Sequence, residues 1–245
     1  MRGSLAAYDM YQVFLNHPFD EEFEPFAQAL HFSVVAAGLI PVCANDLNAP
    51  DRPRLEMLVD AITHCHYSIH DFSRSRGEGS NNFARFNMPI EMGMALFHAL
   101  NTQRNRHRCA FFVATPYDYQ VFASDLSGLD PKHYDKDDDL SLAASVYDWL
   151  RGLGNPLIKQ LPTAEVKKKY RFFKEQLKKI EGGGKDDYPS HDEVQELMFR
   201  ICSDCKWWTL RDGTHDLPTL PLSWKDASSH SLHSPIDVVP KLGST

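Results

Sequence analysis

Three neighbouring stretches of the chain decide its fold. Residues 67–72 read Tyr-Ser-Ile-His-Asp-Phe, residues 89–100 read Pro-Ile-Glu-Met-Gly-Met-Ala-Leu-Phe-His-Ala-Leu, and residues 109–114 read Cys-Ala-Phe-Phe-Val-Ala. The first and third have the length and composition of strands, whereas the second is long enough for a helix and has proline in its first turn. A wholly apolar strand is typical of a parallel sheet that is covered on both faces. The order strand, helix, strand therefore predicts part of such a sheet.

The chain before residue 67 repeats this alternation. Short strands are predicted over 11–15 and 39–43, and helices over 22–37 and 53–64. Because crossovers between parallel strands are right-handed, the economical arrangement is an α/β fold, a flavodoxin-like or Rossmann-like parallel sheet with helices on both faces. The order of the strands does not follow from the pattern. The apolar face of the last of these helices is expected to consist of Leu55, Leu58, Val59 and Ile62.

The pattern changes after residue 116. Residues 118–139 are polar and rich in aspartate, and helices are predicted over 140–150, 164–180 and 194–202. The start of the last helix is marked by a capping box, Ser190 and Glu193. These helices follow the alternating part of the chain and add a helical region to it.

We therefore expect three parts in this chain. They are an α/β domain over 1–155, a helical C-terminal extension over 156–210, and an extended or disordered tail over 211–245. The tail is rich in proline, serine and histidine and has no helical or strand periodicity.

The composition narrows the possible partners. A formal net charge of −7 argues against the broad positive field that nucleic-acid-binding proteins use. No stretch approaches the roughly 20 consecutive apolar residues that span a bilayer, and Met1 to Leu5 open no apolar signal region. We therefore expect a cytoplasmic protein with neither a membrane nor a nucleic acid as partner. The cysteines and histidines, including the single pair Cys202 and Cys205, show no convincing metal-ligand spacing, so neither a metal nor a cofactor is expected.

Glu91 is the central candidate for chemistry. In an open parallel sheet, ligands bind outside the carboxyl ends of the strands. A helix that starts at Pro89 puts Glu91 near its N-terminus at this edge, where the helix dipole favours the ionised carboxylate. A fixed carboxylate can stabilise, or trap covalently, the oxocarbenium-like state that forms when a ribosyl C–N bond breaks. Stabilisation of the helix end explains the residue equally well.

Polar residues near the strand ends each have two interpretations. Asp71 could accept hydrogen bonds from ribose hydroxyls, or cap a loop. Asn16 could bind a base or ribose, or close the turn after its strand. Asn87 could face the pocket, although a helix cap is the simpler interpretation.

Three more residues lie farther from these strand ends or in loops. Arg85 could clamp a phosphate with two hydrogen bonds, or form a surface ion pair. Asp125 and His133 could line the pocket from its far side, or belong to a solvated loop.

Part of the chain resembles a bacterial family related to nucleoside 2-deoxyribosyltransferases and to TIR domains. The likeness covers about residues 8–152. It lies in Val13-Phe-Leu-Asn-His-Pro-Phe-Asp20, Cys65-His-Tyr-Ser-Ile-His-Asp-Phe-Ser-Arg74, Arg85-Phe-Asn-Met-Pro-Ile-Glu-Met-Gly93 and, less distinctively, Asp125-Leu-Ser-Gly-Leu-Asp130 with His133 and Val146-Tyr-Asp-Trp-Leu150.

The resemblance implies a nucleotide or nucleoside pocket in which Glu91 matches the catalytic glutamate of the family. Members of this wider group act on nucleosides, nucleotides or NAD, and the TIR-like members often serve as effectors in bacterial antiphage defence. The loop before the glutamate is longer here than in the deoxyribosyltransferases and carries Arg74, Arg76 and Arg85. Such a loop suits a substrate that bears phosphate.

The leading hypothesis is an N-glycosidase or glycosyltransferase that cleaves the ribosyl–base bond of NAD or a related nucleotide. Glu91 and Asp71 are its predicted catalytic residues. Its predicted substrate-binding residues are Asn16, Arg74, Arg85, Asn87, Asp125 and His133. The rival hypothesis is a non-catalytic sensor that binds a nucleotide and signals through its C-terminal helices to a protein partner or a second copy of the chain.

Overall fold

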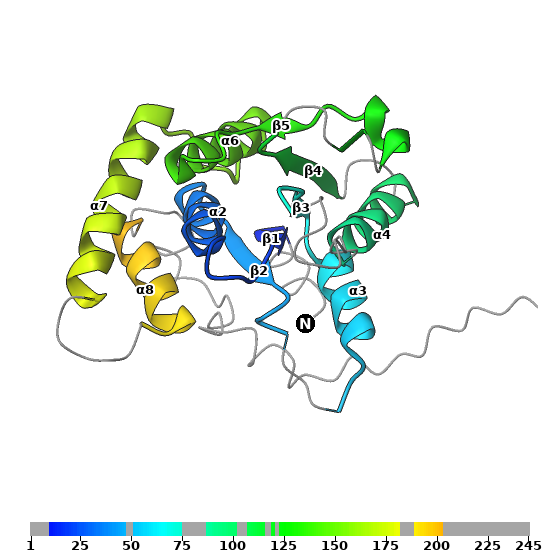
Figure 1. The fold of residues 1–245 in the computed structure, drawn as a ribbon, viewed down its shortest axis with the longest axis horizontal. Coiled ribbons are helices and arrows are strands. Elements are labelled where there is room, and N and C mark those ends of the chain that lie inside the picture. Colours follow the sequence, from blue (N-terminus) through cyan, green and yellow to red (C-terminus); the bar gives the residue numbers. More distant parts are fainter. Residues whose placement is uncertain are drawn as a thin grey trace, which may run out of the picture.

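A five-stranded parallel sheet forms the centre of the computed structural model (Figure 1). The structure describes residues 10–47, 51–74, 87–101, 107–115, 119–120, 123–181 and 189–202. The strands are β1 (Gln12–Asn16), β2 (Ile40–Cys43), β3 (Tyr67–Asp71), β4 (Arg108–Val113) and β5 (Lys132–His133). All pairings are parallel, and the order β2-β1-β3-β4-β5 is that of flavodoxin-like proteins. The expected α/β fold is confirmed.

The chain reverses its direction across the sheet at β1. It leaves β1 to form β2 on one side, and then returns to form β3 on the other side. In sheets of this kind, ligands bind in the crevice outside the carboxyl ends of the strands at such a switch point. Here those ends carry Asn16 and His70, which lie opposite each other in the register of β1 and β3.

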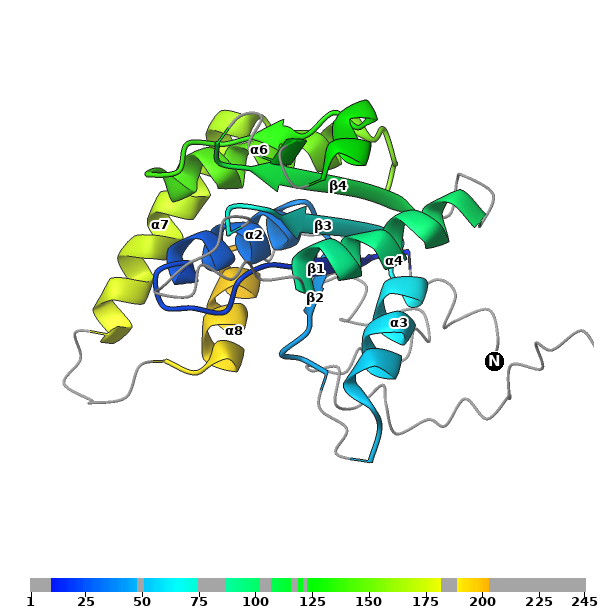
Figure 2. The same ribbon diagram turned by 45° about the vertical axis from the view of Figure 1, so that its right-hand side comes forward.

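Helices cover both faces of the sheet (Figures 1 and 2). The helices α3 (Arg54–His64) and α4 (Asn87–Asn101) lie on one face, and α2 (Glu24–Ala36) and α6 (Asp139–Gly152) lie on the other. A short 3-10 helix, η1 (Ser124–Gly128), precedes β5. Among the described residues, no helix combines the length and the apolar character that a bilayer crossing requires.

Alternation along the strands assigns their side chains to these two faces. Val13 and Leu15 of β1 pack with α2 and α6, whereas Phe14 packs with α3 and α4. In β3, Tyr67 and Ile69 likewise belong to the α2 side. Because every second residue points the same way, Asp71 points to the α2 side as well.

The C-terminal helices belong to the same core as the sheet. The helix α7 (Thr163–Glu181) packs on α2 and α6, and α8 (His191–Ile201) packs on α7 and α2. The expected capping box of Ser190 and Glu193 at the start of α8 is present. The predicted tail over 211–245 lies outside the described residues.

Two local expectations differ from the structure. The pattern did not predict β5, because this edge strand has only two residues and both are polar. Leu55 and Val59 are exposed rather than buried, because α3 packs through the narrower stripe of Leu58, Ala61 and Ile62.

Pro41 fits within β2 because β2 is an edge strand, where one missing backbone N–H is tolerated.

Phe173 provides a test of whether α7 belongs to the core. Its fully buried ring lies 5.4 Å from the Phe32 ring of α2, whereas the neighbouring Phe172 is half exposed. We expect Phe173→Ala to lower the free energy of unfolding by about 3–5 kcal/mol, because it removes a buried ring and leaves a cavity. Phe172→Ala should change it by less than about 0.5 kcal/mol. Urea denaturation followed by circular dichroism measures both, and equal losses would contradict this packing.

Candidate functional site

Asn16 joins three elements at the switch point. Its Nδ2 amide donates to Nδ1 of His70 at the end of β3 and to the backbone oxygen of Met88 in the first turn of α4, both over 2.9 Å. Asn16 and His70 are buried, so these hydrogen bonds are shielded from water. Both amide hydrogens of Asn16 are therefore used in contacts to β3 and α4, and not in closing the turn after β1.

The tautomer of His70 follows from this contact. An amide nitrogen only donates, so Nδ1 of His70 accepts and the ring proton of the neutral imidazole is on Nε2. Burial lowers the pKa of His70 to about 3, which keeps the ring neutral. Within the described part of the chain, the buried Nε2 has no hydrogen-bond partner.

Glu91 lies one helical turn beyond Met88, on the side of α4 that faces the sheet. Its side chain is only 7% exposed, and among the described residues no hydrogen bond to its carboxyl group is present. Burial raises its pKa from 4.5 to about 7, against the opposing effect of the Arg54 guanidinium at the start of α3. The carboxyl group is thus divided between its two protonation states near neutral pH.

This state of Glu91 corrects the expectation that the helix dipole keeps the carboxylate ionised. The helix begins at Asn87 rather than Pro89, so Glu91 is its fifth residue and lies beyond the first turn. The dipole acts mainly within that turn. Desolvation is the larger effect at this position, and it favours the neutral acid.

Asp71 does not lie with Glu91. Its carboxylate accepts hydrogen bonds from the Tyr134 hydroxyl over 2.7 Å, from the Ser73 backbone over 2.9 Å and from the Ser73 hydroxyl over 2.5 Å. It is fully buried, and burial raises its pKa. Asp71 points to the α2 side of the sheet, whereas Glu91 is on a helix of the other side. These contacts match the loop-capping interpretation of Asp71.

Arg74 is paired with two acidic side chains. Its guanidinium lies 3.1 Å from Asp20 and 2.8 Å from Glu22, in the segment between β1 and α2. It therefore ties the segment after β3 to the segment after β1. The two other predicted loop arginines, Arg76 and Arg85, lie outside the described residues.

The three remaining predicted residues are exposed. Asn87 is the first residue of α4, Asp125 lies in η1, and His133 ends β5. In the described ranges, no hydrogen bond or ion pair joins any of them to Glu91. Asn87 is one helical turn before Glu91 on the same face of α4, whereas no described contact brings Asp125 or His133 to Glu91.

Sequence reasoning missed two residues near these carboxylates. Arg54 lowers the pKa of Glu91. Its position at the start of a predicted helix could have indicated this, because helices that follow parallel strands begin beside the carboxyl ends of those strands. Tyr134 reaches Asp71 from beyond β5. No sequence signal could have shown this contact, since β5 itself was not predictable.

A second group of polar side chains follows β1 and β2 on the α2 side of the sheet. It consists of His17, His31, Cys43, Asp46 and His191. The ligand atoms of His17, His31 and Cys43 all lie within 4.8 Å of one another, as do those of Cys43, Asp46 and His191. These residue types are the ones that bind transition metals in proteins.

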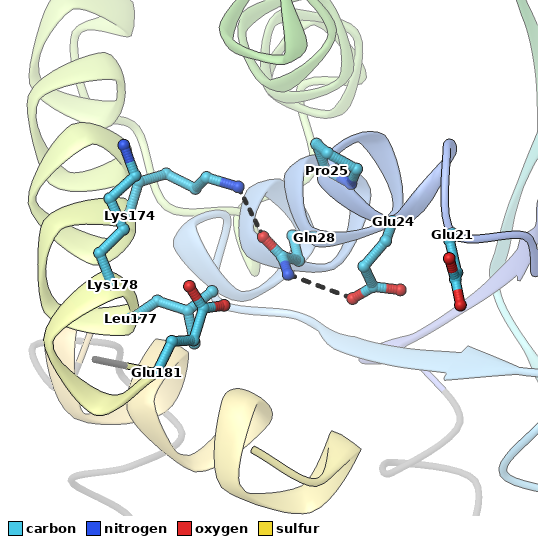
Figure 3. Close-up of a pocket in the computed structure, with 8 residues that line it drawn as sticks. All are labelled: Glu21, Glu24, Pro25, Gln28, Lys174, Leu177, Lys178 and Glu181. Carbon is cyan, nitrogen blue, oxygen red and sulfur yellow. Dashed lines mark hydrogen bonds between the residues drawn. The ribbon is translucent and has the colours of Figure 1, made fainter. Parts of the chain in front are cut away.

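A small surface pocket is lined neither by Glu91 nor by any of these potential metal ligands. Figure 3 shows it between α2 and α7, where Gln28 accepts a hydrogen bond from Lys174 over 2.7 Å and donates one to Glu24 over 3.1 Å. Its volume of about 150 Å³ is below the range that ligand pockets usually occupy. It contains none of the predicted site residues.

No known family model and no curated protein matches this chain.

The raised pKa of Glu91 predicts a pH-dependent stability. Because the folded state disfavours ionisation, the ionised carboxylate lowers the free energy of unfolding. This loss is absent below the unfolded pKa of 4.5, grows as the pH rises towards about 7 and is constant above that. A shift from 4.5 to about 7 corresponds to about 3 kcal/mol. Relative to the wild type, Glu91→Gln should gain up to that amount in unfolding free energy between about pH 5 and about pH 8.

Urea denaturation across this pH range measures the difference. The control is Glu175→Gln on the exposed face of α7, which should follow the wild type at every pH. Parallel curves for Glu91→Gln and the wild type would show that the carboxyl group is solvated rather than buried.

Proposed function

We propose that this protein is a cytosolic N-glycosidase, or a glycosyltransferase, that cleaves the ribosyl–base bond of NAD or a related nucleotide, with Glu91 as its catalytic residue. One observation carries the proposal. Glu91 is a nearly buried carboxyl group with a pKa of about 7, and it lies one turn beyond the helix contact made by Asn16 at the switch point of the sheet. Carboxyl groups in such surroundings are suited to acid, base or nucleophilic chemistry near neutral pH.

The reaction needs little besides this carboxylate. The bond between C1′ of the ribose and the base nitrogen breaks, and both of its electrons leave with the base. The ionised Glu91 attacks the electron-poor C1′ to form a glycosyl ester, or stabilises the oxocarbenium ion until water adds. Nicotinamide leaves NAD as a neutral molecule, so no proton donor is required for that substrate. Water, or a second acceptor in the transferase case, then takes the ribosyl group.

The sequence likeness gives independent support. Residues 85–93 resemble the segment that carries the catalytic glutamate in proteins related to nucleoside deoxyribosyltransferases and TIR domains. On this basis we place Arg85 at a substrate phosphate, and we include a role as an antiphage defence effector in the proposal. Asn16 positions α4 through the Met88 carbonyl. We leave Asp71 out of the catalytic set, because its carboxylate is held by Ser73 and Tyr134.

Incubation of the full chain with NAD, nucleotides and nucleosides tests the proposal. We expect release of nicotinamide or a free base, measured by liquid chromatography, and a loss of at least about 100-fold in Glu91→Gln. Glu175→Gln should retain full activity. Activity that survives in Glu91→Gln would refute the role of this residue. Tight nucleotide binding by calorimetry with no turnover would instead favour the sensor, whose signal would pass through α7 and α8 where they pack on α2.

The pH dependence of kcat/KM provides a second test. If Glu91 acts in its ionised form, kcat/KM should rise with a midpoint near pH 7. The Arg54 guanidinium lowers the pKa of Glu91, so Arg54→Gln should move this midpoint to higher pH. The neighbouring Arg52, which pairs with Asp60, provides the control, and Arg52→Gln should leave the midpoint in place. An unchanged midpoint in Arg54→Gln would assign the titration to another group.

A further inference from the structure

Three potential metal ligands converge beside the carboxyl ends of β1 and β2. His17 directly follows β1, His31 lies in the middle of α2, and Cys43 is the last residue of β2. All three are buried, with exposed fractions of 3%, 3% and 1%. One nitrogen of each histidine and the sulfur of the cysteine lie within 4.8 Å of one another.

The imidazole of His17 is oriented as a metal-binding histidine is. Nδ1 of His17 donates to the Pro18 carbonyl oxygen over 2.8 Å, because a carbonyl oxygen only accepts. This contact leaves the lone pair of His17 on Nε2, and such a second hydrogen bond is the usual support of a metal-bound imidazole. Burial lowers the pKa of both rings, that of His17 to about 4, so both are neutral.

The spacing of the two nitrogens fits one bound ion. Nε2 of His17 lies 3.3 Å from Nε2 of His31. Two imidazole nitrogens at about 2.0–2.1 Å from a tetrahedral zinc ion lie about 3.3 Å apart. The other ring nitrogen of His31, Nδ1, is buried and has no partner among the described residues. In the structure Nε2 of His31 donates a hydrogen bond to Nε2 of His17, and this contact uses neither Nδ1 of His31 nor the sulfur of Cys43.

Two more donors lie on the other side of Cys43. Asp46 follows β2, and His191 is the first residue of α8. The Asp46 carboxylate lies 3.3 Å from Nε2 of His191 and accepts a hydrogen bond from the Cys43 backbone over 2.7 Å. Either side chain could therefore provide the fourth ligand of an ion bound by His17, His31 and Cys43.

We propose that His17, His31 and Cys43 bind a transition-metal ion of the zinc class, with Asp46 or His191 as the fourth ligand. Two neutral imidazoles and a thiolate form a ligand set that zinc prefers, and four ligands would close the site as in structural zinc sites. Binding removes the proton of the Cys43 thiol to solvent as the metal–sulfur bond forms. The ion would fasten α2 to the ends of β1 and β2, and would also fasten α8 if His191 is the fourth ligand.

This site is independent of the proposed glycosidase. It lies on the α2 side of the sheet, whereas Glu91 is on α4 at the other side. Glu91→Gln should therefore bind metal as the wild type does. Loss of catalysis and loss of metal binding can thus be told apart.

Metal analysis of the full chain, with any histidine tag removed, tests the proposal directly. We expect about one equivalent of zinc per chain after purification, and a thermal midpoint that falls when a strong chelator removes the ion and recovers when zinc is returned. Replacement by cobalt should produce a thiolate-to-metal charge-transfer band together with visible bands of a tetrahedral ion.

Substitutions then identify the ligands. Cys43→Ser and His31→Gln should weaken zinc binding at least about 100-fold in competition with a chromophoric chelator. The matched control is Cys65→Ser, a buried cysteine in the core on the α3 side, which should bind zinc normally. Asp46→Asn and His191→Ala, at partly exposed positions, decide the fourth ligand, because only one of them should change the cobalt spectrum.

Three results would overturn the site. They are a wild-type protein that binds neither zinc nor cobalt, a cobalt spectrum without thiolate charge transfer, and Cys43→Ser binding zinc as tightly as the wild type. If Cys43→Ser fails to fold, the cobalt spectrum of the wild type still decides whether a thiolate is bound.

Discussion

The side-chain amide of Asn16 holds together the part of the molecule on which the rest depends. Its two hydrogen bonds connect β1, the end of β3 and the first turn of α4 at the point where the chain reverses across the sheet. The contact on α4 is the backbone oxygen of Met88. This contact sets where α4 begins relative to the strands, and so it sets the position of Glu91, one turn farther along.

The sheet separates two sets of polar residues that both lie at the carboxyl ends of its strands. Side chains alternate along a strand, so consecutive residues at a strand end point to opposite faces of the sheet. Asn16 and His70 therefore join the α4 side with Glu91, whereas His17, Asp71 and Cys43 join the α2 side. The carboxyl ends of the strands can in this way hold a buried carboxyl group on one face and a cluster of metal-binding residue types on the other.

Burial, more than helix position, governs the chemistry of Glu91. A carboxylate in the first helical turn is stabilised by the dipole, but Glu91 lies beyond that turn and its side chain faces the core. Loss of hydration then favours the neutral acid and raises the pKa to about 7. The same residue that local sequence marks as a charged helix-end group thus becomes one that titrates near neutral pH.

The sequence by itself determined the class of fold, because apolar strands such as residues 109–114 and helical spacing such as that of residues 164–180 are local properties of the chain. It also singled out Glu91 and the capping box of Ser190 and Glu193. Only the tertiary structure decided the strand order, the separation of Asp71 from Glu91, and the meeting of His17, His31 and Cys43. The physical reason is that register and packing bring together residues from different elements, and no spacing along one chain records such contacts.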